Sequence, residues 1–228
     1  MNLTYAKRIL VLAVLGALVA IYLTYEHYED KGSVCDISSF ISCSVVNKSE
    51  FAKLLNVPIA ILGLSWNIVL LIGSWEIIRH GKASASREYA NDVALLVFLW
   101  CLAGGGFVIY LVVAEVIVGA ICPFCTVTHI LIVAALYNSS RMYSESKQSH
   151  FDIGKIGMGV YIKGLLRRVG HLVAVAGLLF IIPLLYFNMT HVEGQEQMFD
   201  EVWLLRLSFI SCCFSSDTFL WKLSSRSW

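Results

Sequence analysis

The sequence predicts an all-α integral membrane protein: a four-helix transmembrane bundle with a fifth transmembrane helix. Of the 228 residues, 58% are hydrophobic and only 14% are charged, whereas soluble domains average about half apolar and about a quarter charged residues. The apolar residues are gathered into stretches near the ~20 residues that an α-helix needs to cross a bilayer. The formal net charge of +1 indicates neither a nucleic-acid surface nor an acidic partner.

Five apolar stretches are predicted to span the membrane. They cover residues 9–25, 58–78, 93–114, 122–137 and 172–187. The third and fourth come from a run over residues 93–137, which is too long for one helix and contains a single charged residue, Glu115. The first and fourth stretches are short, so they would use flanking residues to reach across the bilayer.

The first stretch also allows a second interpretation, a secretory signal peptide. Lys7 and Arg8 would form its basic region. A cut after Ala20 would place Leu18 at the −3 position, where a small residue is expected, so a retained span fits better. Under both interpretations the chain emerges on the same side of the membrane.

The basic residues predict the orientation. Eleven Lys and Arg residues fall on one side of the spans and six on the other. The side richer in Lys and Arg near the spans is usually cytoplasmic. The loop 26–57, the turn 115–121 and the tail 188–228 are therefore expected outside the cytoplasm.

The cysteines follow the same division. The seven are Cys35, Cys43, Cys101, Cys122, Cys125, Cys212 and Cys213. All except Cys101 fall outside or at the outer interface, in the type of compartment where disulfides form and persist. Cys101 lies within the third span and is expected to be a small buried apolar residue.

Several chemistries use a Cys-x-x-Cys motif such as Cys122–Cys125. Attachment of c-type haem requires His directly after the second cysteine, where this chain has Thr126. Zinc remains an alternative, because Cys122, Cys125 and His129 offer three ligands and Cys43 or His27 a fourth. A purely structural disulfide also remains open.

A redox role for this motif has three physical supports. Pro123 suits the first turn of a helix, where its missing N–H costs nothing. A thiol at a helix N-terminus faces free N–H groups and the positive end of the helix dipole, which favour the thiolate. The second pair, Cys35 and Cys43, lies on the same predicted side and offers a source of electrons.

The context of both pairs resembles the vitamin K epoxide reductase family in its bacterial form. The matching pieces are Cys35-Asp36, Ser42-Cys43-Ser44, Ser49, Gly63 in the second span and Cys122–Cys125, all within about residues 1–140. The order of the motifs also distinguishes this family. The other bacterial quinone-linked disulfide-forming membrane enzyme has its Cys-x-x-Cys in the first outer loop, whereas here the motif opens the last helix of the bundle.

The resemblance implies a quinone-dependent protein-dithiol oxidoreductase, with a four-helix bundle around a quinone and an electron relay through the cysteines. Cys35 would meet the reduced cysteine of a thioredoxin-fold partner. Cys43 would attack Cys122 to form a transient disulfide, and Cys125 would be the thiolate that contacts the quinone. The implied setting is a bacterial cytoplasmic membrane with the active site on the outer, periplasmic side.

The resemblance also points to residues of the quinone pocket. They are Ser49, His129, Trp66 and Asn67. Each has an ordinary structural alternative: a helix cap for Ser49, a carbonyl-bonded interface residue for His129, a packing or interfacial aromatic for Trp66, and contact between helices for Asn67. The pocket asparagine of vertebrate members aligns with Ile59, which favours ubiquinone or menaquinone over vitamin K epoxide. Vertebrate members have tyrosine at the position of His129.

Four segments are therefore expected. They are a catalytic bundle over residues 1–140, a cytoplasmic linker over 141–170, the fifth transmembrane helix over 171–188 and an extracytoplasmic tail over 189–228. Many bacterial family members continue into a thioredoxin-like domain, and this tail is interpreted as a truncated or altered remnant of one, with a separate partner protein. Two other classes compete, a membrane zinc protein without redox turnover and a structural assembly factor. The three consecutive glycines Gly104, Gly105 and Gly106 are expected to permit close helix contact or a local bend.

Overall fold

The computed structural model describes residues 2–29, 33–83, 86–147 and 164–190. Its long helices are α1 (Leu3–Tyr28), α3 (Ile59–His80), α4 (Arg87–Val118), α5 (Pro123–Lys147) and a further helix, Gly164–Thr190. The all-α fold class predicted from the sequence is confirmed. Most helices are longer than the apolar stretches that predicted them. Their ends carry polar residues, which a prediction based on apolar stretches leaves out.

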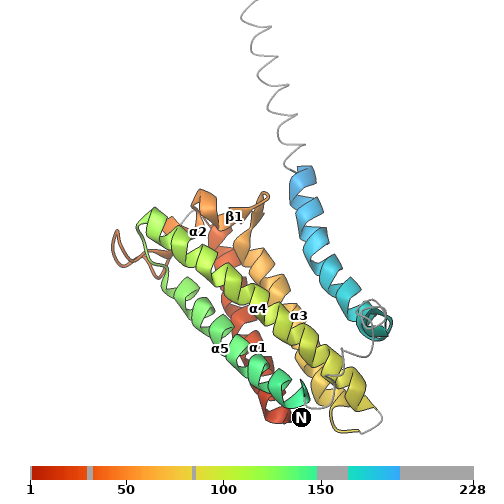
Figure 1. Ribbon diagram of the computed structural model, residues 1–228. Coiled ribbons are helices and arrows are strands. Elements are labelled where there is room, and N and C mark those ends of the chain that lie inside the picture. The colour runs from red at the N-terminus through yellow and green to blue at the C-terminus, as the bar shows by residue number, and fades with distance from the viewer. Residues whose placement is uncertain (1, 30–32, 84–85, 148–163, 191–228) are drawn as a thin grey trace, which may run out of the picture. The chain divides into compact units, whose positions relative to one another are not determined.

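The first four long helices form a closed bundle (Figure 1). Helix α1 packs against α3 and α5, and α4 packs against the same two helices. Each helix therefore has two neighbours and shares one apolar interior. The short elements α2 (Cys43–Asn47), η1 (Glu50–Ala52), β1 (Lys53–Leu54) and β2 (Val57–Pro58) connect α1 to α3. In Figure 1, α2 and β1 lie at the end of the bundle opposite the N-terminus.

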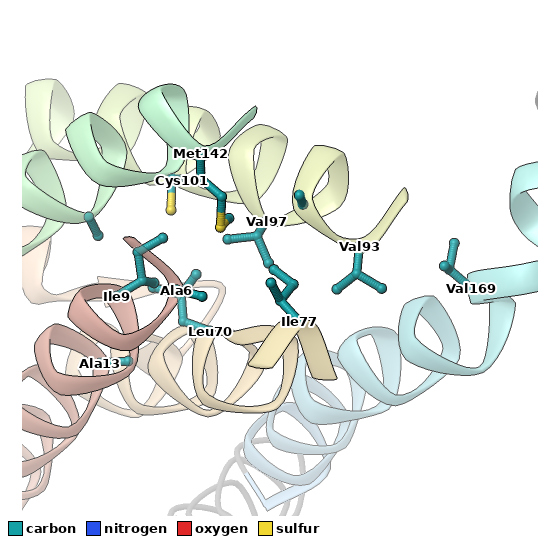
Figure 2. Close-up of a cluster of buried hydrophobic side chains, with 12 residues drawn as sticks. Ala6, Ile9, Ala13, Leu70, Ile77, Val93, Val97, Cys101, Met142 and Val169 are labelled. Atoms are coloured by element: carbon teal, nitrogen blue, oxygen red, sulfur yellow. The ribbon is translucent and has the colours of Figure 1, made fainter. Parts of the chain in front are cut away.

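The interior of the bundle is a single apolar cluster, shown in Figure 2. It includes Ile9 from α1, Leu70 from α3, Val97 from α4 and Met142 from α5, all nearly or fully buried. Cys101 belongs to this cluster and is a free, fully buried cysteine, as expected. Because lipid is as apolar as these side chains, close packing rather than exclusion of water holds such an interior together.

Four of the described helices are long and apolar enough to cross a membrane, namely α1, α3, α4 and Gly164–Thr190. Helix α5 is not among them, although a span was predicted over residues 122–137. Its apolar middle is flanked by polar residues that bond within the helix: Thr126 donates to the Cys122 carbonyl at 3.1 Å and Asn138 to the Ala134 carbonyl at 2.7 Å. Polar groups bonded in this way can lie in a bundle without exposing unpaired donors.

The chain divides into two compact units, Met1–Leu184 and Leu185–Trp228. Within the first unit, the Gly164–Thr190 helix contacts the bundle through Arg168, whose guanidinium lies 2.6 Å from Glu88 and 2.7 Å from the buried Asp92. Val169 also joins the apolar cluster. The expectations for residues 191–228, including Cys212 and Cys213, fall outside the described residues, as does part of the expected linker.

Gly104 of α4 lies at a close contact with α3. A Cβ atom added there would meet Trp66 Cζ2 at 2.6 Å, closer than real Cβ atoms come to their neighbours. The close contact expected for this glycine is thus confirmed. Gly106, two residues further along the same helix, has no neighbour within 4 Å of such an atom.

We expect Gly104→Ala to destabilise the folded protein by about 1–3 kcal/mol, because the rigid indole of Trp66 must shift. The matched control, Gly106→Ala, should be neutral or slightly stabilising, because alanine favours helix over glycine by about 1 kcal/mol. Thermal unfolding of both variants in detergent tests this expectation. Equal midpoints for the two variants would show that the indole moves freely.

Candidate active site

Two disulfides lie at the loop end of the bundle. Cys35 is bonded to Cys43 and Cys122 to Cys125, with Cα–Cα distances of 5.7 and 5.1 Å. Cys35, Cys43 and Cys122 belong to one buried cluster with Leu23, and Cys125 packs against it. The fold therefore brings together the two pairs that the sequence suggested.

A short backbone bridge joins the segments that carry the two pairs. Ile41 and Ile121 pair in parallel, the Ser42 N–H donates to the Ile121 carbonyl at 3.1 Å, and the Ile121 N–H donates to the Phe40 carbonyl at 2.8 Å. Cys43 follows Ser42 directly, and Cys122 follows Ile121. The bridge thus fixes the loop that follows α1 against the start of α5, beside the cysteines.

Asp36 organises the loop between Cys35 and Cys43. Its carboxylate accepts hydrogen bonds from the hydroxyls of Ser42 at 2.7 Å and Ser44 at 2.6 Å, and from the backbone N–H groups of Ser33 at 2.7 Å and Ser44 at 3.1 Å. These bonds, the Ser42 hydroxyl foremost, hold the pKa of Asp36 well below its usual range. Ser42 also caps α2, because its hydroxyl accepts from the Val45 N–H at 3.2 Å.

Cys122 stands at the N-cap of α5. The backbone N–H of Cys125 donates to Cys122 Sγ at 3.1 Å, and Pro123 occupies the first position of the helix. The Cys-x-x-Cys therefore lies at a helix N-terminus, as its sequence predicted. Free N–H groups and the helix dipole stabilise negative charge on sulfur at this position.

A cavity of about 350 Å³ lies next to the disulfides. This volume is within the ordinary range for small-molecule sites. Most of its lining is apolar and comes from α1, α3, α4, α5, the segment from α2 to Leu55, and the Gly164–Thr190 helix. Cys125 is the one cysteine of the four that lines it, whereas Cys43 and Cys122 are fully buried.

The four residues predicted for the pocket all line this cavity. They are Ser49, Trp66, Asn67 and His129. His129 is 7% exposed, and its Nε2 has no hydrogen-bond partner within the described residues. Ser49 occupies the N-cap position of η1, but its hydroxyl donates to the Val46 carbonyl at 2.8 Å instead of capping that helix.

Trp66 and Asn67 combine packing with pocket positions. Trp66 lies against Gly104, and its Nε1 is buried without a partner in the described part of the chain. The Asn67 amide donates to the Gly63 carbonyl at 2.8 Å within its own helix and contacts Gly16 of α1. Asn67 therefore joins two helices by close packing against a glycine, while its side chain also faces the cavity.

Two carboxyl groups at the site were not predicted as site residues. Glu115 lines the cavity, where its Oε1 is buried without a hydrogen-bond partner among the described residues. Glu26, near the end of α1, is buried beside the Cys35–Cys43 disulfide. In the sequence, the one feature that could have indicated these two residues is a charge at the edge of an apolar stretch. An ordinary residue at the membrane interface has the same feature.

The potential zinc ligands that lie together in the structure differ from those that the sequence suggested. Among the described residues, one group of metal-type donors comes together, and it consists of Glu26, Cys35 and Cys43. Cys122, Cys125 and His129 do not form such a group there. The cysteines of both pairs are bonded to each other as disulfides, and zinc requires thiolates.

Two packed disulfides at the end of an apolar helical bundle, one at a helix N-terminus and beside a cavity, define a membrane thiol oxidoreductase. The chain matches the vitamin K epoxide reductase family over residues 7–139, more than half its length, and it belongs to this family. A search of curated proteins found no match to the chain. The multi-pass membrane character predicted from composition agrees with both the helices and the family.

The hydrogen bonds of Asp36 predict a pH dependence of the loop. Because the folded loop lowers the pKa of Asp36, the stability it contributes is fully present above its ordinary pKa of about 4 and is lost as the pH falls further. Asp36→Asn, which keeps one acceptor oxygen of two, should speed hydrogen exchange of the Ser44 amide by roughly tenfold at neutral pH. Wild-type protein should approach this rate only in strong acid. Equal protection in both proteins at neutral pH would contradict the assignment.

Proposed function

We propose that this chain oxidises the dithiol of a thioredoxin-fold partner outside the cytoplasm of a bacterial cell and passes the electrons to a membrane quinone. It would thereby support disulfide bond formation. The observation that carries the proposal is the burial of two disulfides in one cluster, with Cys125 of one pair lining an apolar cavity. Membership of the vitamin K epoxide reductase family supports thiol oxidation as the reaction.

Electrons would enter at Cys35. Cys35 is 7% exposed and Cys43 is fully buried, so an incoming thiolate has better access to Cys35 Sγ. Its attack would break the Cys35–Cys43 bond, and the electron pair would leave on Cys43. The exposed apolar side chains of Val34, Ile37 and Phe40 around Cys35 offer a surface on which the partner can dock.

Transfer between the pairs would follow by thiol–disulfide exchange. Cys43 would attack Cys122 Sγ, the Cys122–Cys125 bond would break, and the electron pair would leave on Cys125. The backbone bridge at Ile121 supports this step by fixing the two segments beside each other. Attack of Cys35 on Cys43 would then release Cys122 and restore the outer disulfide. Exchange favours a leaving thiol of low pKa, which the N-terminus of α5 provides.

The cavity has the properties that a quinone headgroup requires. Its walls are mostly apolar, and His129 Nε2 and Glu115 Oε1 are buried there without partners among the described residues. A bound ubiquinone or menaquinone supplies an acceptor for two electrons and two protons. His129 would donate a hydrogen bond to a carbonyl oxygen of the quinone. Trp66, Asn67 and Ser49 would shape the wall of the cavity.

The relay predicts a trapped intermediate in Cys125→Ala. Without Cys125, Cys122 can attack Cys43 and release Cys35 as a thiol, and nothing can resolve the new Cys43–Cys122 bond from the other side. Peptide mapping under non-reducing conditions should find this bond as the dominant state, and quinone reduction should be lost. Cys101→Ala, a matched control remote from the relay, should show both native disulfides and normal turnover. A dominant Cys35–Cys43 bond with free Cys122 in Cys125→Ala would contradict the assigned roles.

The proposed orientation predicts the accessibility of two exposed lysines. Lys53, in β1, lies at the disulfide end of the bundle, and Lys82 follows α3 at the other end. In a Cys212→Ala, Cys213→Ala background, a membrane-impermeant thiol reagent should label Lys53→Cys in intact cells. Lys82→Cys should be labelled only after the cells are opened. The opposite pattern would place the disulfides in the cytoplasm and remove the basis for an oxidising role.

A further inference from the structure

Glu26 is a buried carboxyl group in the last turn of α1. It is 4% exposed, and neither carboxylate oxygen makes a well-formed hydrogen bond among the described residues, although the Ser33 hydroxyl lies near enough to act on the carboxylate. A buried charge with so little support is costly, so this environment favours the neutral form of the acid, which carries a proton. The C-terminal end of a helix is also the negative end of its dipole, which gives a carboxylate no support. The fold thus retains an acid that contributes little to stability.

The sulfurs of the outer disulfide lie beside this carboxyl group. A carboxylate oxygen of Glu26 and the Sγ atoms of Cys35 and Cys43 lie within 4.8 Å of one another. The Ser33 hydroxyl lies 3.1 Å from Cys35 Sγ and 3.4 Å from the Tyr22 hydroxyl, which connects the same site to further groups that can exchange protons. A proton carried by Glu26 is therefore close to both reacting sulfurs.

The other charged groups near Glu26 are committed elsewhere. Asp36 and Lys48 act on Glu26 through their charge. The oxygens of Asp36 accept hydrogen bonds from the serines of the loop, and the Lys48 ammonium donates to the Glu29 carbonyl. The ring of His27, on the same helix, bonds the Asn47 carbonyl at 2.7 Å. Glu26 is the acid left available to the outer cysteine pair within the described part of the chain.

We propose that Glu26 is the proton-transfer residue of the Cys35–Cys43 pair, an inference that rests on the proposed thiol oxidation. When the partner's thiolate attacks Cys35 Sγ, the electron pair of the broken bond leaves on Cys43. The Glu26 acid gives its proton to that thiolate and becomes a carboxylate. The carboxylate takes the proton back as Cys43 attacks Cys122 Sγ, where the electron pair leaves on Cys125. Glu26 ends the cycle in its starting form.

The test measures the rate at which dithiothreitol reduces the Cys35–Cys43 disulfide in purified protein without quinone. The rate is measured from mildly acidic to mildly alkaline pH. Glu26→Gln keeps the shape of the side chain but cannot give up a proton, so the rate at neutral pH should fall by roughly 100-fold. The part of the pH profile that reports an acid should disappear. Glu26→Asp should retain that part with a lower rate, because the shorter side chain is further from the sulfurs. Glu50→Gln, which changes an exposed acid of the same loop, should match wild type.

Three outcomes would overturn the proposal. One is a pH profile of the reduction rate in Glu26→Gln that matches wild type. Another is a reduction rate in Glu26→Asp equal to that of wild type, and this result decides the question if Glu26→Gln does not fold. The third is stoichiometric zinc in the reduced protein that Glu26→Gln releases, since Glu26 would then be a metal ligand with Cys35 and Cys43. The measurement reports the first step, reduction of the Cys35–Cys43 pair, and needs no quinone, so it stands apart from the Cys125→Ala trap, which tests the relay to the cavity.

Discussion

The backbone bridge between Ile41 and Ile121 is the contact on which the arrangement of the site depends. It joins a loop that follows α1 to the turn that precedes α5, two segments far apart in the sequence. Its hydrogen bonds use main-chain groups that would otherwise need partners at the end of an apolar bundle. Cys43 follows Ile41 by two residues, and Cys122 follows Ile121 directly. A shift of the pairing by one residue would therefore turn Cys43 or Cys122 away from the buried cluster.

The remaining features of the site adjust what this bridge holds in place. Asp36 fixes the loop between Cys35 and Cys43 by accepting four hydrogen bonds, and the N-terminus of α5 carries Cys122 and Cys125. Gly119, with φ of 73°, ends α4 in the left-handed conformation and lets the chain turn sharply into the bridge. The hairpin of β1 and β2 completes the wall of the cavity through Leu54 and Leu55.

Much of the fold could be predicted from the sequence because lipid imposes a simple pattern, about 20 apolar residues for each span. The cysteine pairs could be predicted from their context, since Asp36 and the flanking serines form a distinctive motif. The membrane span predicted in α5 is less clear, because polar residues such as Thr126 and Asn138 lower the mean hydropathy of this helix. Their side chains bond within the helix. The hairpin was missed because Leu55 adopts a φ of 51°, which its residue type does not favour. Glu26 resembled an interfacial residue, and only tertiary packing shows its burial.

The burial of Cys43 and Cys122 has a consequence for how the protein would behave among other thiols. Both middle members of the proposed relay are fully enclosed, whereas Cys35 is slightly accessible and Cys125 borders the cavity. Small reductants and oxidants in the surroundings therefore have no direct path to the central sulfurs. In the proposed relay, electrons would therefore enter only at Cys35, from a docked protein, and leave only at Cys125, toward the cavity.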